Sequence, residues 1–336
     1  MNGRLENELN IDDKIENKLA SMPKYVSDWH LNLKASGKTA ATRFEYISKI
    51  HQFLESISDN LIDVELSQIN ETTVTNFFID CQKKETANGD VQKTSDSYQQ
   101  MVWCVLNSFT EYLYKKKYIS LNYTSLIDKP KNKDLARVNA HRILLTEDDF
   151  NAILKAVDSS TGDSGEEHRR GWRDKAILVL LMSTGMRRTA LLNINISDVD
   201  FENKEISVID KGEKRFVYKM NEMLEFTLND WVRCRSQYGT GPKSDALFIS
   251  NRGTRLSGRA LSDMIKKYSK QGLGYSISPH KLRAGFCSIM YNKTNDIEFV
   301  RRAVGHSNVT TTQRYIVTDS SERQKSSNIM GEILSI

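Results

Sequence analysis

Apolar residues recur every three or four positions through the first third of the chain, which is the spacing of one face of an α-helix. In the last such stretch, for example, Met101, Val105 and Phe109 fall on a single stripe. Four stretches follow the pattern, at residues 25–36, 42–57, 72–82 and 97–118. They predict a small helical domain over residues 21–127, preceded by a polar extension at residues 1–20.

The helical pattern stops at residues 128–145. This stretch is polar and basic, includes Pro130 and has no apolar face to bury, so it predicts a linker. A helix start follows, because Thr146 has the side chain of an N-cap residue and the next turn is acidic, which suits the positive end of a helix dipole. The linker therefore separates two differently patterned halves.

Residues 146–318 mix helical and strand patterns. A buried helix is predicted in RDKAILVLLMSTG, which ends near Gly185. The runs ISVI and RFVYKM flank a Lys-Gly turn and predict a hairpin, and ALFIS at 246–250 predicts another short strand. Further helices are expected at residues 257–270, 279–292 and 296–304. The sequence thus predicts a mainly α domain with one small antiparallel β-sheet, then a C-terminal tail at residues 319–336.

Composition narrows the function classes. The N-terminus is polar and acidic, unlike a secretory signal, and no apolar run is long enough to span a bilayer. The four cysteines are scattered, with neither a C-x-x-C pair nor the spacing of a zinc site. These features favour a cytoplasmic protein with reduced thiols.

Positive charge is concentrated in two stretches. The formal net charge is +5, and all of the excess lies after residue 145. Residues 115–142 hold eight basic and two acidic side chains, and residues 252–283 hold eight and one. Such stretches suit a surface that follows DNA phosphates, although charge alone favours a solvated helix face. The candidate DNA contacts are Lys129, Lys131, Lys133, Arg137, Arg252 and Arg255.

Three short boxes in the second half hold basic side chains beside small residues. STGMRRTALL places Arg187 just after a helix-ending glycine, and DKGEKR places Lys211 at the hairpin turn. In SPHKLRAGF, His280 and Arg283 are three positions apart at a helix start and therefore share one face. Taken singly, each box is typical of a surface cation, a solvated turn or a capped helix end.

A fourth box, VGHSNVTTTQRY, adds His306 and Tyr315, and a Tyr so near the C-terminus is by itself typical of packing. Together the four boxes resemble the tyrosine recombinase (phage-type integrase) family, including its Xer-like site-specific recombinases. That family has an Arg in T-G-L-R-x-x-E-L, a Lys in a G-K-G hairpin, then H-x-L-R, L-G-H and a Tyr nine residues later. The resemblance covers residues 146–318 in order and spacing, and the N-terminal helices resemble the family's SAM-like core-binding domain.

Some positions depart from the family pattern. The acidic residue of the first box is Ala190 here, which removes a carboxylate that would support a catalytic Arg. Where the family often continues H-x-L-R with His-Thr, this chain has Ala284 and Gly285. Met186 and Val304 replace leucines conservatively. None of these changes removes a catalytic side chain of the pattern.

The resemblance implies a catalytic set and a reaction that needs no metal or other cofactor. Tyr315 is the implied nucleophile, which forms a 3′-phosphotyrosine and releases a 5′ hydroxyl. The arginines and His306 would stabilise the phosphate, Lys211 would be the general acid and His280 the base. The implied catalytic residues are Arg187, Lys211, His280, Arg283, His306 and Tyr315.

The implied partners are double-stranded DNA, three further protomers in a tetramer on two DNA sites, and accessory DNA-bending proteins. Integration or excision of a mobile element is the expected role, and chromosome-dimer resolution remains an alternative. A type IB topoisomerase and a DNA-binding regulator with a vestigial site are further alternatives. Apolar residues of the tail recur at helical spacing, which suits docking on either its own or a neighbouring protomer.

Overall fold

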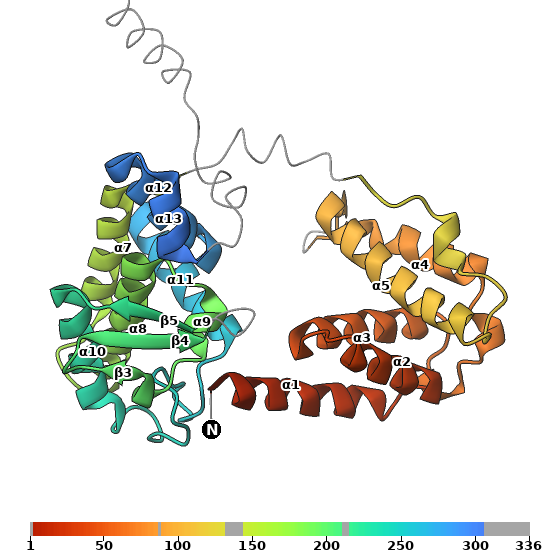
Figure 1. Ribbon diagram of the computed structural model, residues 1–336, viewed down its shortest axis with the longest axis horizontal. Helices are drawn as coiled ribbons and strands as arrows, with labels where there is room; N and C mark the ends of the chain where they lie inside the picture. The colour runs from red at the N-terminus through yellow and green to blue at the C-terminus, as the bar shows by residue number, and fades with distance from the viewer. Residues whose placement is uncertain (1–2, 87–88, 132–143, 210–214, 306–336) are drawn as a thin grey trace, which may run out of the picture. The chain divides into compact units, whose positions relative to one another are not determined.

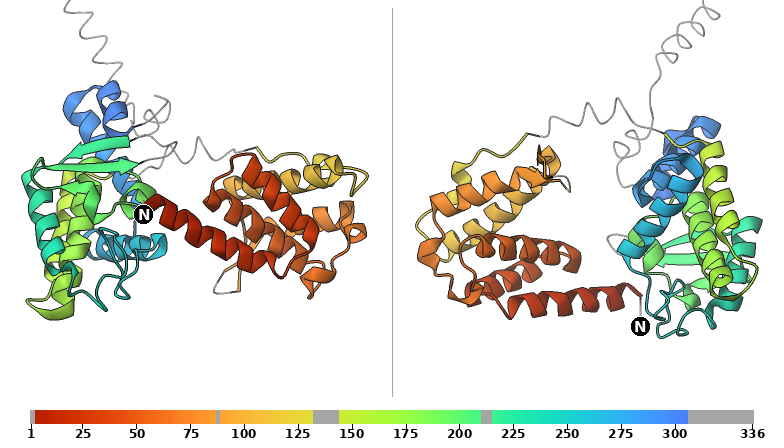
Figure 2. Two further views of the ribbon diagram at one scale, coloured as in Figure 1. Left: turned by 60° about the horizontal axis from the view of Figure 1, so that its bottom comes forward. Right: turned by 180° about the vertical axis from the view of Figure 1, so that it is seen from behind.

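The computed structural model describes residues 3–86, 89–131, 144–209 and 215–305. The chain forms two compact units, Leu5–Arg142 and Ile143–Ile336 together with Met1–Arg4, called below the helical unit and the C-terminal unit. Figures 1 and 2 show that helices dominate both units and that the strands are short. This confirms the predicted fold class. In the part of the chain that is described, no helix is both long and apolar enough to cross a bilayer.

Over its described residues, the helical unit contains five helices and one short hairpin (Figure 1). The helices are α1 (Gly3–Leu19), α2 (Lys24–Ala35), α3 (Ala40–Glu55), α4 (Glu71–Cys81) and α5 (Asp96–Lys115). Antiparallel strands β1 (Lys83–Glu85) and β2 (Val91–Lys93) lie between α4 and α5 in the chain, and 3-10 turns occur at Leu61–Asp63, Leu66–Gln68 and Tyr123–Leu126. The four helices predicted from apolar spacing are thus confirmed as α2 to α5.

The apolar stripes of these helices form one core. Trp29 of α2, Phe53 of α3 and Phe109 of α5 are fully buried. The rings of Trp29 and Phe109 meet edge to face at 5.0 Å between centroids, and those of Phe53 and Phe77 do so at 5.3 Å. Burial of large aromatic side chains is a main stabilising contribution in a domain of this size.

Helix α1 lies in the segment expected as a polar extension. Its one apolar residue per turn is enough to pack it, since Ile15 and Leu19 are buried in the core of the helical unit. Its Asp12 also forms an ion pair with the buried Arg43 of α3 at 2.9 Å. Arg43 in turn lies 2.9 Å from Nε2 of the buried His30 of α2.

The start of the predicted linker packs on α5. The Pro130 carbonyl accepts a hydrogen bond from Gln100 at 2.6 Å, and the Trp103 indole donates to the Ile127 carbonyl at 2.8 Å. The Lys129 ammonium lies 5.5 Å from the centre of the Trp103 ring, a cation–π distance. Residues 132–143 of the predicted linker fall outside the described residues. At its end the prediction is wrong, because Leu145 is buried in the core of the C-terminal unit.

Residues 144–209 and 215–305 of the C-terminal unit are mainly helical, with one three-stranded sheet (Figure 2). Its helices are α7 (Glu147–Ser160), α8 (Gly165–Thr184), α9 (Arg188–Leu192), α10 (Glu222–Arg235), α11 (Gly258–Leu273), α12 (Pro279–Thr294) and α13 (Ile297–Val304). The strands β3 (Val199–Asp200), β4 (Glu205–Ile209) and β5 (Arg215–Lys219) pair antiparallel in that order. Residues 176–181 of α8 are all buried, so α8 forms the centre of the core.

One predicted strand is wrong. Residues 246–250 do not join the sheet, and β3 takes the third place in it. The segment makes only isolated bridges, from Ala246 to Asn195 and from Ile249 to Arg255. Its apolar side chains are nevertheless buried, and the Trp231 indole donates to the Leu247 carbonyl at 2.8 Å. It is therefore a buried core segment that bends at Leu247 and Phe248 and is not part of a ladder.

Candidate active site

Arg187 is positioned by the sharp turn between α8 and α9. Helix α8 ends at Gly185, whose φ of 59° is in the left-handed region that favours glycine. A Cβ at this position would also overlap the ring of Phe286 on α12. Met186 is then buried, and Arg187 is the N-cap residue of α9 with an extended backbone. The turn thereby directs the Arg187 side chain out of the core.

His280 and Arg283 lie on the first turns of α12, which begins at Pro279 after the N-cap Ser278. Arg283 is only 4% exposed. Its guanidinium donates to the Gly185 carbonyl at 2.6 Å and to the Val304 carbonyl at 2.8 Å. Arg283 therefore links the end of α8, the start of α12 and the end of α13.

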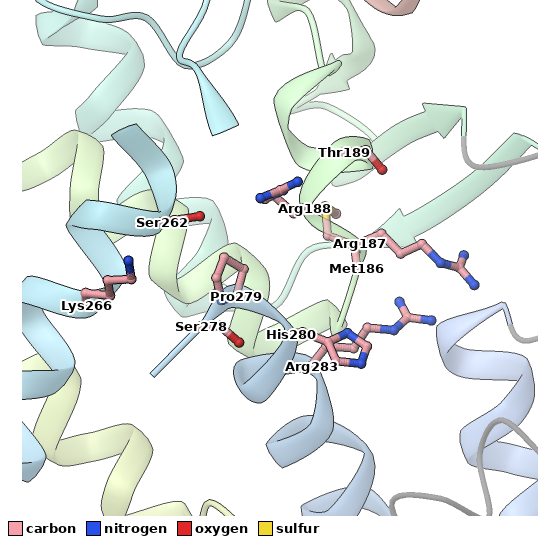
Figure 3. A pocket seen from close by; sticks show the side chains of 10 residues that line it. All are labelled: Met186, Arg187, Arg188, Thr189, Ser262, Lys266, Ser278, Pro279, His280 and Arg283. Carbon is pink, nitrogen blue, oxygen red and sulfur yellow. The ribbon is translucent and has the colours of Figure 1, made fainter. Parts of the chain in front are cut away.

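The three side chains meet at one cleft. The cleft has a volume of about 610 Å³ and includes Arg187, His280 and Arg283 in its lining. Figure 3 shows the guanidinium groups of Arg187 and Arg283 and the imidazole of His280 directed toward the same end of this cleft. The structure thus brings together residues from two boxes that are far apart in the sequence, and two permanently charged planar groups converge where an oxyanion can bind.

Two further cations line the cleft, and the sequence pattern does not mark either of them as a site residue. They are Arg188, the neighbour of Arg187, and Lys266 of α11. The available signal was the Arg-Arg pair itself, because adjacent side chains at a helix start point in different directions. Sequence spacing alone does not show that α11 forms the opposite wall.

Lys211 lies outside the described residues, between two strands that are described. Its flanking strands pair as far as Ile209 opposite Arg215, and Ser207 pairs with Val217. The hairpin prediction is therefore confirmed up to the last pair before Lys211. The role of Lys211 itself stays a prediction.

The last described residue before His306 is Gly305, which ends α13 with a φ of 67°. A Cβ on Gly305 would lie 2.6 Å from the Phe216 ring of β5. The conformation and the close contact both require glycine, so the chain leaves α13 beside the β4–β5 hairpin. His306 and Tyr315 themselves lie outside the described residues.

At the position where the family pattern has an acidic residue, this chain has the buried methyl group of Ala190. Ala190 is 3% exposed and lines a second cavity of about 370 Å³. Asp198 and Asp245 also line this cavity. The Asp198 carboxylate accepts a hydrogen bond from the Asn195 backbone N–H at 2.8 Å, which assigns it a local capping role.

The candidate DNA contacts are in different environments. Lys131 and Arg252 are exposed, and Lys129 is exposed beside Trp103. Arg255 is partly buried, with its guanidinium 2.9 Å from the Leu192 carbonyl and 2.6 Å from the Asn195 side-chain oxygen. These bonds give Arg255 a structural role at the end of α9. Lys133 and Arg137 lie outside the described residues.

Three described side chains of the C-terminal unit, Cys234, Tyr268 and Cys287, are poorly suited to nucleophilic attack. Burial raises the pKa of the Cys287 thiol to about 11, although the Arg283 charge opposes this shift. Burial also raises the pKa of Cys234 and, together with Asp174, that of Tyr268. The Tyr268 hydroxyl donates to the Asp174 carboxylate at 3.0 Å. Neutral, buried groups of this kind are weak nucleophiles at neutral pH.

The sequence matches known proteins over the whole of this site. The model of the phage integrase family matches residues 144–322. Tyrosine recombinase XerC of Shewanella amazonensis is 33% identical over 215 residues, which cover 64% of this chain and 68% of the relative. Tyrosine recombinase XerC of Caldanaerobacter subterraneus is 31% identical over 277 residues, which cover 81% and 71%.

The fold also matches a solved structure, that of a lambda integrase tetramer bound to a Holliday junction. The TM-score is 0.58 at 16% identity, and the match covers 88% of this chain and 76% of the other. At that identity the similarity shows a common fold. The family model and the two sequence relatives go further, and with the convergence of Arg187, His280 and Arg283 they show that the chain belongs to the phage integrase family of tyrosine recombinases.

Proposed function

We propose that this recombinase cuts and rejoins DNA at specific sites through a 3′-phosphotyrosine formed by Tyr315. The observation that carries the proposal is the meeting of Arg187, His280 and Arg283 at one cleft. Two guanidinium forks beside an imidazole suit a phosphodiester, whose two non-bridging oxygens accept paired hydrogen bonds. The boxes that hold Lys211 and His306 follow the described ends of β4 and α13.

In the cleavage step, the Tyr315 oxygen attacks the phosphorus and the bond to the 5′ oxygen breaks. Negative charge grows on the non-bridging oxygens, where Arg187 and Arg283 stabilise it. His306 donates a further hydrogen bond to the same phosphate. The tyrosine displaces the 5′ oxygen, so the protein becomes joined to the 3′ phosphate.

Two proton transfers accompany this step. His280 accepts the proton of the phenol, and Lys211 protonates the departing 5′ oxygen. Rejoining reverses these transfers when a 5′ hydroxyl attacks the phosphotyrosine. Because the covalent intermediate retains the energy of the phosphodiester bond, the rejoining step needs no nucleotide cofactor.

Strand exchange between two duplexes requires four active protomers, so we propose a tetramer on two DNA sites, assisted by accessory DNA-bending proteins. The tetramer of the structurally similar lambda integrase supports the assembly. The departures from the family pattern at Ala190, Ala284 and Gly285 motivate a role in integration or excision of a mobile element. Chromosome-dimer resolution is the alternative role.

The proposal is tested with a nicked duplex from which the cleaved end diffuses away and cannot be rejoined. Incubation in a chelator, without nucleotide, should yield a covalent protein–DNA adduct and a free 5′ hydroxyl. Ends with a 5′ phosphate and no adduct would reject the reaction. Relaxation of supercoiled plasmids without sequence preference would instead support the topoisomerase alternative.

A further inference from the structure

The cleft of the active site has a second basic end. Figure 3 shows the guanidinium groups of Arg187 and Arg188 directed to opposite sides of the cleft. Arg188 points toward α11, whose Ser262 and Lys266 line the same cleft. A distance confirms that Arg188 lies close to α11. A Cβ added to Gly258, the first residue of α11, would lie 3.6 Å from the Arg188 guanidinium carbon. Arg188 and Lys266 therefore face one region.

The cleft is larger than a single phosphate requires. Its volume of about 610 Å³ equals that of roughly twenty water molecules at ~30 Å³ each. Arg187, His280 and Arg283 occupy only one end of it. The remaining length is lined by side chains that can donate hydrogen bonds, including the hydroxyls of Ser262 and Ser278.

The second end of the cleft remains positively charged despite a nearby carboxylate. Lys266 lies 3.8 Å from the Asp263 carboxylate, and Arg259 is at the same distance from it. One exposed carboxylate thus faces two cations, and an ion pair of such length and exposure is weak in water. Arg188 is exposed as well. The guanidinium of Arg188 and the flexible ammonium of Lys266 together suit a second phosphate, beside the one expected at Arg187 and Arg283.

We propose that Arg188 and Lys266 form a second phosphate subsite, which holds the backbone phosphate next to the scissile one on the cleaved strand. The inference rests on the proposed function, because Arg187, His280 and Arg283 define the first subsite. Phosphates of one strand follow each other at about 3.4 Å along the helix axis, so one cleft can take two of them. Gripping the neighbouring phosphate fixes the scissile one in line with its nucleophile.

The test pairs protein variants with DNA in which one phosphate at a time is a neutral methylphosphonate. For the unchanged protein, neutralising one phosphate adjacent to the scissile position should weaken binding. For Arg188→Ala/Lys266→Ala, the same neutralisation should have no further effect, because the cations that met this charge are gone. An equal loss of affinity for both proteins at every adjacent phosphate overturns the subsite.

Salt dependence gives a second readout on unmodified DNA. The double variant should lower the slope of log affinity against log salt by about 0.9, the value for one phosphate that the protein no longer neutralises. The matched control is Lys267→Ala, because Lys267 neighbours Lys266 but lies over the Tyr268 ring at 4.7 Å and is not part of the cleft lining. An unchanged slope in the double variant, or the same decrease in the control, contradicts the proposal.

Failure of the subsite can be separated from failure of the proposed function. Adduct formation by the unchanged protein on the nicked duplex reports the first subsite and Tyr315. The adduct can form while neutralising each adjacent phosphate weakens binding equally for the unchanged protein and the double variant. In that case only the second subsite is wrong. If no adduct forms, the proposed function is wrong and the subsite falls with it. Both side chains are exposed, so the variants should unfold at the temperature of the unchanged protein.

Discussion

Arg187 and Arg283 are expected to act on the same phosphate, yet their surroundings in the structure differ. Arg187 is half-buried at the start of α9. Arg283 is buried and bonds the last carbonyls of two helix ends, at Gly185 and Val304. Arg283 therefore holds the site together in addition to supplying charge.

This difference predicts distinct variants. Arg187→Ala and Arg283→Ala should each slow adduct formation by roughly 10²–10³-fold, as removal of one electrostatic donor does in other enzymes. Arg283→Ala should also lower the free energy of unfolding, by about 1–3 kcal/mol, because it leaves buried carbonyls without their donor. Thermal unfolding and single-turnover cleavage measure the two effects. An Arg283→Ala variant as stable as the unchanged protein would contradict the linking role of Arg283.

Residue chemistry in the boxes predicted three of the side chains that line the cleft, but neither Arg188 nor Lys266. Arg187, His280 and Arg283 were predictable because order and spacing specify them. Arg255 was predicted as a DNA contact from its charge alone, yet its guanidinium bonds the end of α9. Lys or Arg in a basic stretch can face DNA or satisfy a carbonyl, and the sequence does not distinguish these outcomes.

At the scale of elements, glycine at helix ends decides where the catalytic segments begin. Helices α11 and α13 both end at a left-handed glycine, Gly274 with a φ of 81° and Gly305 with a φ of 67°. Around Gly274 nothing lies within 4 Å of an added Cβ, whereas at Gly305 the Phe216 ring of β5 lies in the way. Only the second glycine couples a helix end to the hairpin that leads to Lys211.

Gly305→Ala should therefore be worse than Gly274→Ala. Both substitutions incur the strain of a left-handed alanine, about 1 kcal/mol. Gly305→Ala must also displace Phe216, so we expect a further decrease in stability and a much slower cleavage, because His306 follows directly. Thermal unfolding and adduct formation on the nicked duplex check this. Similar decreases in both variants would show that the packing of Gly305 against Phe216 is unimportant.

The contact between α2 and α3 should depend on pH, because it is made through His30. Burial and the Arg43 charge, assisted by Lys34, hold the pKa of His30 below its ordinary value, although Glu16 and Asp12 oppose them. Neutral His30 accepts a hydrogen bond from Arg43 through Nε2. Its contribution to stability is complete above the unfolded-state pKa, about 6.5, and is lost as the pH falls below it, because the unfolded chain then binds the proton more readily.

The measurement is the free energy of unfolding between about pH 7 and 5, in the range where unfolded histidine titrates. It should fall more steeply for the unchanged protein than for His30→Gln, which keeps an acceptor for Arg43 but does not titrate. Parallel curves for the two proteins would show that His30 is not the titrating group.

Elements with strong apolar periodicity were predictable, and those stabilised by a few long-range contacts were not. Helices α2 to α5 follow from their stripes. Helix α1 has one apolar residue per turn, and its ion pair with Arg43 joins residues far apart in the chain. Residues 246–250 have the composition of a strand, but the Leu247 N–H bonds the Ile194 carbonyl in a single bridge. A short apolar run does not specify whether a partner strand is beside it.

For the whole molecule, the central physical expectation is that both units bind DNA phosphates. Replacing Lys129, Lys131 and Lys133 by Gln should weaken DNA binding and flatten its salt dependence by about 0.9 log unit for each phosphate that is no longer neutralised. Site preference should be unaffected, because bonds to phosphates position the protein and do not read bases. Binding titrations at several salt concentrations, on a cognate and a scrambled site, measure both. An unchanged slope would remove these lysines from the DNA-binding surface.

The most direct test of the proposed chemistry identifies the residue that becomes joined to DNA. The adduct trapped on the nicked duplex is digested with protease, and the peptide that carries the nucleotide is sequenced by mass spectrometry. We predict that the modified residue is Tyr315, and that Tyr315→Phe binds the same DNA with unchanged affinity and forms no adduct. Attachment at any other residue, or an undiminished adduct in Tyr315→Phe, would contradict the proposed mechanism.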